Sequence, residues 1–211
     1  MPLFFERFLL IRIEAHAMRP LFIILVSGLF LFVTDPATAQ DRFGVEVRIG
    51  PEFATQELGD AALNTGFGSE VVFSYRFLPH LAAYGGWGYG RFSADGNSFA
   101  GTNVDVEETG YTFGFQFIHP VRASRYGYFI RAGGVYNHIE IENDAGDITA
   151  DSGHGLGWQV GAGPVITFGQ RWTVMPGLRY RSLSRDIEVD GGSTAADLTY
   201  LSVGVGIMLT F

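Results

Sequence analysis

A two-residue alternation between bulky apolar side chains and small or polar ones repeats along the chain from Gln40 to the last residue. It is clearest over residues 199–211, where the odd positions from Leu201 onward are all apolar and the even positions are mostly Ser, Gly and Thr. Neighbouring side chains of a β-strand point to opposite faces of the sheet, so this period predicts strands with one apolar face. No segment after Gln40 shows the 3.6-residue period of an amphipathic helix. The alternation therefore predicts an all-β fold.

The same alternation defines eight strands. They are predicted over residues 43–50, 70–77, 81–92, 110–117, 126–141, 156–167, 172–181 and 199–211. Pro164 and Pro176 lie inside two of them, where a proline removes a hydrogen-bond donor and is a candidate site for a β-bulge. Long connections (54–65, 94–103, 143–152 and 189–195) alternate with short ones (78–80, 119–125 and 169–171). Long loops at one end, short turns and both termini at the other, and an even strand count are typical of an up-and-down barrel in an outer membrane.

The two faces of the strands indicate which one meets lipid. In a soluble β-sandwich the polar face points to water and is rich in Lys, Glu and Thr. Here lysine is absent from the whole chain, and the face opposite the apolar one holds mainly Gly, Ser, Thr and Gln with isolated Arg and Glu. We therefore expect the apolar face to contact lipid and the small, polar face to fill a narrow lumen. The predicted fold is all-β, an eight-stranded antiparallel up-and-down transmembrane β-barrel.

Aromatic residues of the apolar face are expected to form a girdle at each membrane interface. At the short-turn end they are Phe77, Phe117, Tyr126, Phe168, Trp172 and Phe211, and at the long-loop end they are Phe67, Tyr89, Tyr136, Trp158 and Tyr200.

The N-terminal segment has the parts of an export signal in their usual order. Residues 21–33 are apolar and uncharged, a basic flank precedes them, and Ala37-Thr38-Ala39 follows them. This predicts a cleavable signal peptide over residues 1–39, cut between Ala39 and Gln40, and a barrel domain over residues 40–211. The apolar stretch is shorter than a membrane-spanning helix needs, although a retained N-terminal anchor is the alternative. Met18 is a second candidate translation start.

Composition narrows the function classes. The chain has no cysteine, which excludes disulfides, thiolate metal sites and cysteine nucleophiles. Its net charge is −8, so it lacks the basic face that nucleic-acid binding needs. The glycine-rich stretches are not followed by a helix, so they are not phosphate-binding loops, and we expect no cofactor.

The chain resembles the small eight-stranded outer-membrane β-barrels, the family of outer-membrane proteins A and X and of the opacity-type surface proteins. The resemblance covers residues 41–211 and is strongest in two Gly-aromatic strands (84–90 and 155–163) and in the terminal alternation ending at Phe211. It implies a location in the outer membrane, among lipid and lipopolysaccharide. It also implies that Phe211, with Leu209 and Ile207 on the same face, forms the signal read by the barrel-assembly machinery. No segment resembles the peptidoglycan-binding domain of the larger members, so their wall-tethering role is not implied.

Several charged and polar side chains have the parity of the lumen. They are Glu46, Arg48, Glu70, Arg76, Gln116, Arg131, Gln159, Arg179 and Arg181. One interpretation is an ion path or gate. The other is a plug of paired charges, which we favour because eight strands enclose a lumen that side chains fill.

The rim formed by the long loops is strongly acidic. Its acids are Glu57, Asp60, Asp95, Asp105, Glu107, Glu108, Glu140, Glu142, Asp144, Asp147, Asp151, Asp186, Glu188, Asp190 and Asp197, and Arg185 is its one expected basic partner. Oxygen ligands of this kind suit Ca²⁺ or Mg²⁺. However, residues 143–147 lack the full spacing of a calcium loop, so we expect solvated loops and no metal site.

A lipid A-modifying enzyme is the alternative of a different class. Relatives that remove acyl chains from lipid A carry a His and a Ser two residues apart on a lipid-facing strand, so that the base reaches the nucleophile. None of His80, His119, His138 and His154 is followed by Ser at that spacing. His138 shares a face with Glu140 but has no Ser or Thr beside it there. We therefore predict that the protein is not an enzyme.

Together these features predict a monomeric outer-membrane protein with a structural or surface-interaction role. It would support membrane integrity, or adhesion and ligand contact with a host or extracellular partner through its acidic loops. A narrow porin-like channel is the main alternative.

Overall fold

The computed structural model describes residues 42–58, 61–94, 104–122, 124–143, 145–189 and 192–211, without the side chains of residues 186–196. The predicted signal peptide and its cleavage site at Ala37, Ala39 and Gln40 lie outside these residues. No helix in this part of the chain is long and apolar enough to cross a membrane.

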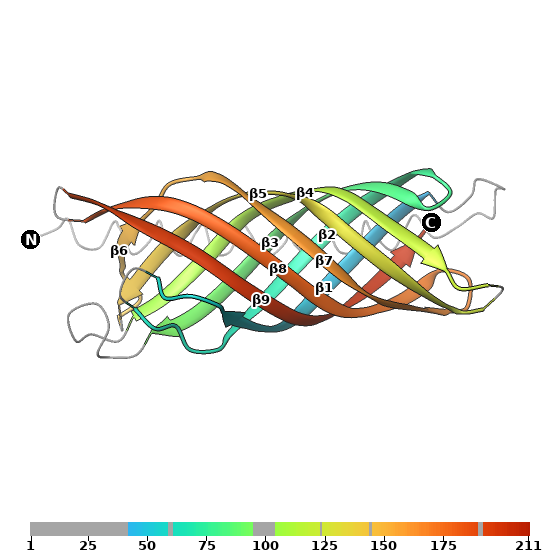
Figure 1. The fold of residues 1–211 in the computed structure, drawn as a ribbon, viewed down its shortest axis with the longest axis horizontal. Coiled ribbons are helices and arrows are strands. Elements are labelled where there is room, and N and C mark those ends of the chain that lie inside the picture. Colours follow the sequence, from blue (N-terminus) through green and yellow to red (C-terminus); the bar gives the residue numbers. More distant parts are fainter. Residues whose placement is uncertain (1–41, 59–60, 95–103, 123, 144, 190–191) are drawn as a thin grey trace, which may run out of the picture. The chain divides into compact units, whose positions relative to one another are not determined.

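The described residues form nine strands (Figure 1). They are β1 (Phe43–Ala54), β2 (Gly66–Leu78), β3 (Leu81–Ala94), β4 (Val104–Pro120), β5 (Tyr126–Asn143), β6 (Ile148–Asp151), β7 (Gly155–Phe168), β8 (Trp172–Val189) and β9 (Gly192–Thr210). Eight of them were predicted from the alternation, and β6 was not. It lies in the predicted connection 143–152.

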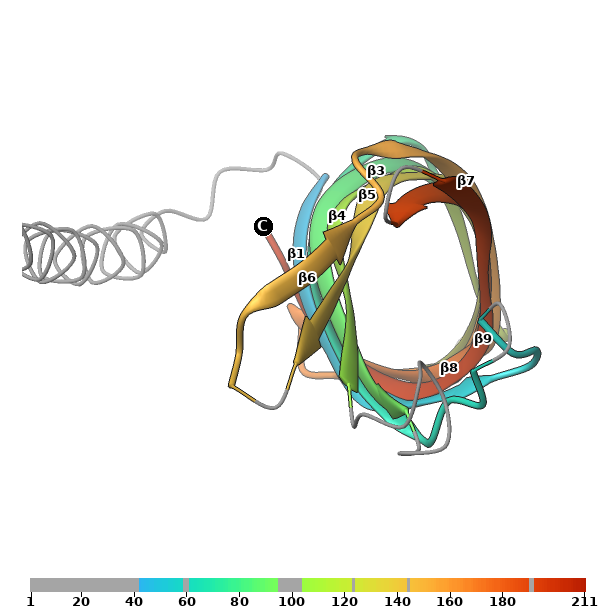
Figure 2. The ribbon, with the colours of Figure 1, turned by 90° about the vertical axis from the view of Figure 1, so that its left-hand side faces the viewer.

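Eight strands close into a ring, which Figure 2 shows end-on. Each strand except β6 pairs antiparallel with its two neighbours, and the first strand pairs with the last, from Gly44 opposite Thr210 to Ala54 opposite Tyr200. Strand β6 pairs only with β5. Closure satisfies the backbone groups that a sheet edge would leave unpaired in hydrocarbon. The predicted antiparallel up-and-down barrel is confirmed.

The strands extend further toward the long-loop end than predicted. The connection predicted over residues 189–195 is wrong, because β8 runs to Val189 and β9 begins at Gly192. These residues are mostly small or polar, so they lack the apolar alternation by which the strands were recognised. Strands β4, β5, β8 and β9 have 17, 18, 18 and 19 residues.

The bulges considered at Pro164 and Pro176 are absent. Ala162 pairs with Leu178 and Ile166 pairs with Val174, so equal numbers of residues separate these pairs on β7 and β8. The register therefore continues unchanged through the stretch in which the two prolines interrupt the ladder. Register shifts occur elsewhere in the described strands, between Arg76 and Leu78 on β2 beside a short turn, and between Ile141 and Glu142 on β5 where it pairs with β6.

The apolar face points outward. The exposed fractions of Val47, Phe73 and Phe115 are 50%, 56% and 59%, whereas Glu46, beside Val47 in the chain, is 2% exposed. Of the predicted girdle residues, Tyr200 is wrongly placed, because it is fully buried in the lumen. Its even position gives it the parity of the inward residues of β9. A wall of exposed rings and branched aliphatics is matched to an apolar surrounding.

Candidate functional site

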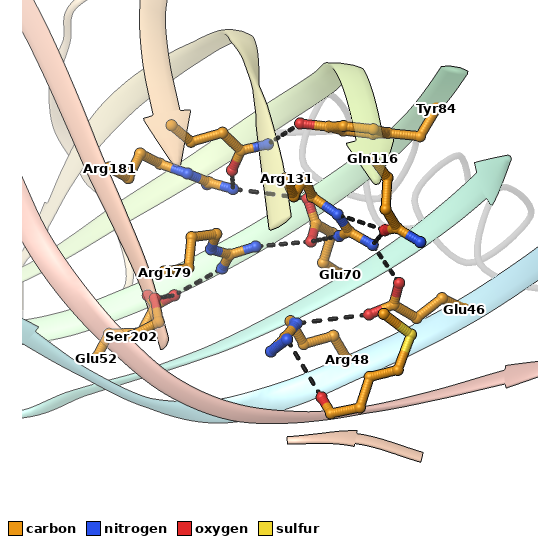
Figure 3. Close-up of polar contacts among 12 residues, drawn as sticks. Glu46, Arg48, Glu52, Glu70, Tyr84, Gln116, Arg131, Arg179, Arg181 and Ser202 are labelled. Atoms are coloured by element: carbon orange, nitrogen blue, oxygen red, sulfur yellow. Dashed lines mark hydrogen bonds and ion pairs between the residues drawn. The ribbon is translucent and has the colours of Figure 1, made fainter. Parts of the chain in front are cut away.

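Inward-facing side chains fill the barrel in three layers. A small apolar cluster near the short-turn end comprises Phe129, Val165, Met175 and Met208, with Ile118 packed against it. A network of charged and polar residues, called here the ionic network, lies in the middle (Figure 3). A larger apolar cluster toward the long-loop end comprises Leu58, Phe92, Ala94, Val104, Val106, Val135, Ile139, Ile141, Leu183, Leu198 and Tyr200.

Arg131 on β5 is one centre of the ionic network (Figure 3). Its guanidinium donates to the Glu46 carboxylate of β1 and, through Nε, to Gln116 Oε1 of β4 at 2.8 Å. Its Nη1 lies 3.7 Å from Glu70 Oε2 of β2. The same group stacks over the Tyr84 ring, 4.8 Å from its centroid. Arg131 therefore joins four other strands across the lumen.

Arg179 and Arg181 on β8 form the other centre. Arg179 donates to Glu70 Oε2 at 2.6 Å and to Glu52 Oε1 at 3.3 Å. Arg181 donates to Glu108 Oε1 at 2.7 Å and to Gln159 Oε1 at 3.0 Å. Glu70 thus accepts a hydrogen bond from Arg179 of β8 and also lies beside Arg131. It therefore connects the two centres.

Arg48 on β1 connects the ionic network to the apolar cluster near the short-turn end. Its Nε lies 3.5 Å from Glu46 Oε1, and its Nη2 donates to the backbone carbonyl of Met175 at 3.3 Å. Its guanidinium also lies over the Phe129 ring at 5.6 Å.

The network balances its charges. Its acids are Glu46, Glu52, Glu70 and Glu108, its bases are Arg48, Arg131, Arg179 and Arg181, and all eight are buried. Each of the eight has a partner of opposite charge, which offsets the cost of burying it. Five of their buried polar atoms make no hydrogen bond within the described residues, namely Glu46 Oε1, Glu52 Oε2, Glu70 Oε1, Arg179 Nε and Arg181 Nε. Arg76, which also has lumen parity in the sequence, is half-buried and lines the cavity at the short-turn end.

Sequence reasoning missed several members of the network. Glu52 lies beyond the predicted end of the first strand, and Glu108 was assigned to the acidic rim. Glu108 is buried, and it accepts hydrogen bonds from Asn137 and from the Tyr200 hydroxyl. Parity carried the signal in both cases, because Glu52 has the parity of Glu46 and Glu108 that of Gln116.

A cavity of about 310 Å³ opens at the short-turn end. Its lining includes Arg42, Arg76 and His80, and it reaches Gln116 of the ionic network and Met208 of the lower apolar cluster. It is therefore a basic vestibule that ends at the filled part of the lumen.

The acidic rim differs from the prediction in its basic partner. Arg185 is buried and donates to the Asn137 side chain at 2.5 Å and to the Leu156 carbonyl at 2.8 Å. The rim base is Arg91, which lies 2.5 Å from Asp105 and 3.4 Å from Glu107. The hydrogen bond and charge of Asp105 raise the pKa of Arg91 above its ordinary value.

Many of the rim acids stand on strands. Asp105, Glu107, Glu140 and Glu142 face outward from β4 and β5, above the apolar band, and Asp151 lies on β6. Asp60, Asp95, Asp144 and Asp190 lie outside the described residues. Two groups could hold a metal ion among the residues that the structure describes, namely His138, Glu140 and Asp151, and Glu107, Glu140 and Glu142.

The proposed assembly residues lie at the seam of the barrel. Ile207 and Phe211 are exposed on the outer face, and Leu209 is half-buried. The backbone of Phe211 exchanges two hydrogen bonds with Phe43, at 2.9 and 3.0 Å. The last residue therefore pairs with the first strand.

The four histidines beside which a nucleophile was sought lie in pairs at opposite ends. His80 and His119 have ring centroids 4.9 Å apart at the short-turn end, and His138 and His154 are stacked at 4.5 Å near the long-loop end. The nearest polar partners of His138 Nδ1 are the carboxylates of Asp151 and Glu140.

A closed antiparallel barrel with an apolar exterior and a polar lumen is an integral β-barrel protein of a bacterial outer membrane. The chain belongs to the family described as the outer membrane protein beta-barrel domain, which matches residues 23–211. Its predicted location in the cell outer membrane and its family resemblance are thereby confirmed.

Solved structures agree on the fold. Neisserial surface protein A is 14% identical, with a TM-score of 0.56 over 83% of this chain and 100% of that one. Outer membrane protein W of E. coli is 13% identical, with a TM-score of 0.52 over 83% of this chain and 100% of that one. OprG of Pseudomonas aeruginosa is 11% identical, with a TM-score of 0.51 over 80% of this chain and 96% of that one. A search of curated proteins finds no match.

Proposed function

We propose that this protein is a non-conducting structural and surface-interaction protein of the outer membrane, and not a channel or an enzyme. The observation that carries the proposal is the filled lumen, in which two apolar clusters enclose a charge-balanced network. An ion crossing the barrel would have to separate buried pairs such as Arg181 and Glu108. Breaking a buried ion pair costs about 3–5 kcal/mol, which opposes spontaneous opening.

The surface role rests on the acidic long-loop end. Outward-facing carboxylates of β4 and β5 stand above the apolar band, where lipopolysaccharide and extracellular ligands are accessible. Divalent cations can join such carboxylates to anionic lipid headgroups. We therefore expect the partners to be membrane lipid, lipopolysaccharide and an extracellular or host ligand, with the barrel-assembly machinery acting through the Phe211 end. The barrel is expected to act as a monomer.

Conductance in planar bilayers tests the proposal. The purified wild-type barrel should give no large, stable current steps. The double variant Arg131→Ala with Glu46→Ala removes one ion pair and weakens the contacts of Arg48 and Glu70. It should conduct more, because it empties part of the network. Large, stable steps from the wild type would overturn the proposal and support the porin-like alternative, which the basic vestibule favours.

Deletion and overexpression strains test the remaining parts. Loss of the protein should increase sensitivity to detergent or reduce binding to host cells, since the proposed role is structural or adhesive. The mass of lipid A should be unchanged on overexpression. A shift equal to the loss of an acyl chain would instead establish a lipid-modifying enzyme.

A further inference from the structure

We propose that His138, Glu140 and Asp151 form a binding site for a divalent transition-metal ion, with Zn²⁺ as its best match, on the outer wall of the barrel near the long-loop end. The site joins β5, which supplies His138 and Glu140, to β6, which supplies Asp151. It lies apart from the lumen, and it uses nitrogen as well as oxygen donors.

The distances between the donor atoms fit a small metal ion. His138 Nδ1 lies 3.4 Å from Asp151 Oδ1 and 3.6 Å from Glu140 Oε1, and the three donors all lie within 4.8 Å of one another. Two ligands at about 2.1 Å from a tetrahedral Zn²⁺ are about 3.4 Å apart. One imidazole with two carboxylates gives three protein ligands and leaves a position for water, as in many zinc sites.

The negative charges opposite Glu140 favour the binding of a cation beside it. Glu140 stands directly opposite Glu107 of β4 on one side and Asp151 of β6 on the other. Like charges directly opposite on neighbouring strands destabilise a sheet. Arg91 lies against Glu107 at the far end of this row, 3.4 Å away. A divalent ion between Glu140 and Asp151 would offset the repulsion between their carboxylates. Isolated surface carboxylates, which have no like charge opposite them, do not need such an ion.

The chain that follows Asp151 already positions two of the three ligands, Asp151 and His138. Asp151 Oδ1 accepts a hydrogen bond from the Gly153 N–H at 2.8 Å, which orients the carboxylate. Gly153 has a φ of 63°, and the turn it makes brings His154 over His138, with the rings nearly parallel at 11°. Such support from neighbouring groups fixes ligand orientation and typically changes metal affinity by about 10–100-fold.

The donor set selects the class of metal. Ca²⁺ and Mg²⁺ prefer oxygen ligands only, whereas imidazole suits Zn²⁺, Cu²⁺ and Ni²⁺. The competing arrangement is a protonated His138 that forms salt bridges with the same two carboxylates. A metal and a proton compete for the same nitrogen, so a direct metal titration separates the two.

The experiment is a calorimetric titration of the untagged barrel, purified in detergent, with ZnCl₂ at neutral pH and in an excess of Mg²⁺. Wild type should bind one Zn²⁺ per barrel in a saturable step. His138→Gln and Asp151→Asn should each weaken that binding by about tenfold or more, because each removes a ligand. Co²⁺ in place of Zn²⁺ should give the intense visible absorption of a four-coordinate site, and the same variants should lose it.

His119→Gln is the matched control, since it removes a histidine from the other end of the barrel. It should keep the affinity of the wild type. Heat-modifiable gel mobility, measured for each variant, verifies that the barrel is closed. We expect every variant to pass this check, because the substituted side chains lie on the outer wall. The proposal is overturned if wild type shows no saturable heat with Zn²⁺, or if His138→Gln binds as tightly as wild type. Neither result would bear on conductance.

Discussion

Arg131 is the residue on which the interior of the barrel most depends. Its guanidinium contacts Glu46, Gln116 and Glu70 from three different strands and stacks on Tyr84 from a fourth. Five donors in one planar group make such simultaneous contacts feasible, which a lysine could not reproduce. The absence of lysine from the sequence is consistent with charges that serve the lumen more than the solvated surface.

Substitution of Arg131 should therefore destabilise the barrel strongly. Arg131→Met should lower the free energy of unfolding by about 3–5 kcal/mol, because Glu46 loses a buried partner. Urea unfolding of the barrel in lipid vesicles measures this. Arg91→Met removes an arginine from an exposed pair and should change stability by at most about 1 kcal/mol. Adding Glu46→Gln to Arg131→Met should recover part of the loss, and full additivity of the two changes would contradict the coupling.

Tyr200 gives a second test at this scale. Tyr200→Phe removes the hydroxyl that donates to the buried Glu108. Leaving a buried acceptor without this donor should cost about 1–3 kcal/mol, again measured by unfolding in vesicles. Tyr111→Phe is the control, since the Tyr111 ring faces outward and is exposed. Equal effects of the two substitutions would place Tyr200 in the girdle that the sequence predicted.

The chemistry of single residues could be predicted only in part. Period and residue type identified Arg131, Gln116, Glu46 and Gln159 as inward-facing, because parity needs no knowledge of contacts. Which acid meets which arginine depends on the stagger between strands that are far apart in the chain. For example, Arg179 and Glu52 are 127 positions apart. That stagger is a property of the closed barrel and cannot be read from one strand.

At the scale of the element, the pairing of β4 with β5 depends on glycines that let backbone and side chains approach. A Cβ added at Gly133 would lie 2.0 Å from the Phe113 carbonyl oxygen and 2.6 Å from the Tyr84 hydroxyl. The Tyr84 side chain thus packs against the backbone of these two strands, where it also supports Arg131.

Gly133→Ala should therefore disturb the β4–β5 pair. We expect a loss of about 1–3 kcal/mol in stability, typical of overpacking, together with a smaller heat-modifiable fraction after refolding. Gly85→Ala is the matched control, because a Cβ there would lie 3.9 Å from its nearest neighbour. A stable Gly133→Ala barrel that retains the Tyr84 contact would show that the backbone moves freely enough to accept a side chain.

Element boundaries were predicted well where lipid imposes an apolar face and poorly where it does not. The short turns at residues 79–80 and 169–171 lie where the alternation ends. The far ends of β8 and β9 continue as hydrogen-bonded strands through small and polar residues, up to the pair of Val189 with Gly192. Backbone hydrogen bonds hold these strand ends together, and such pairing cannot be predicted from a pattern of apolar residues.

At the scale of the whole molecule, the apolar band defines where the bilayer lies. Phe115→Arg places a charge in this band and should destabilise the folded barrel by about 2–4 kcal/mol near the midplane. Ile148 is similarly exposed but stands on β6, beyond the closed ring. Ile148→Arg should change stability by no more than about 0.5 kcal/mol. Unfolding in vesicles compares the two, and equal costs would contradict this placement of the membrane.

The global architecture could be predicted almost completely from the sequence. The faces of the strands, the closure and the membrane location all follow from one requirement, which is that hydrocarbon accepts apolar side chains and no unpaired amides. The filling of the lumen and the hairpin of β5 with β6 could not be predicted in the same way. They are determined by packing among residues that share no short-range pattern.

The long strands have a mechanical consequence. A bilayer needs about 9–11 residues per tilted strand, whereas β9 has 19, so roughly 8 residues continue past the lipid. At a rise of about 3.3 Å and a tilt near 40°, they raise the tips by about 20 Å. The strand ends at the long-loop end should therefore stand clear of the lipid headgroups, where we expect antibodies and proteases to reach them past the sugars of the surrounding lipid.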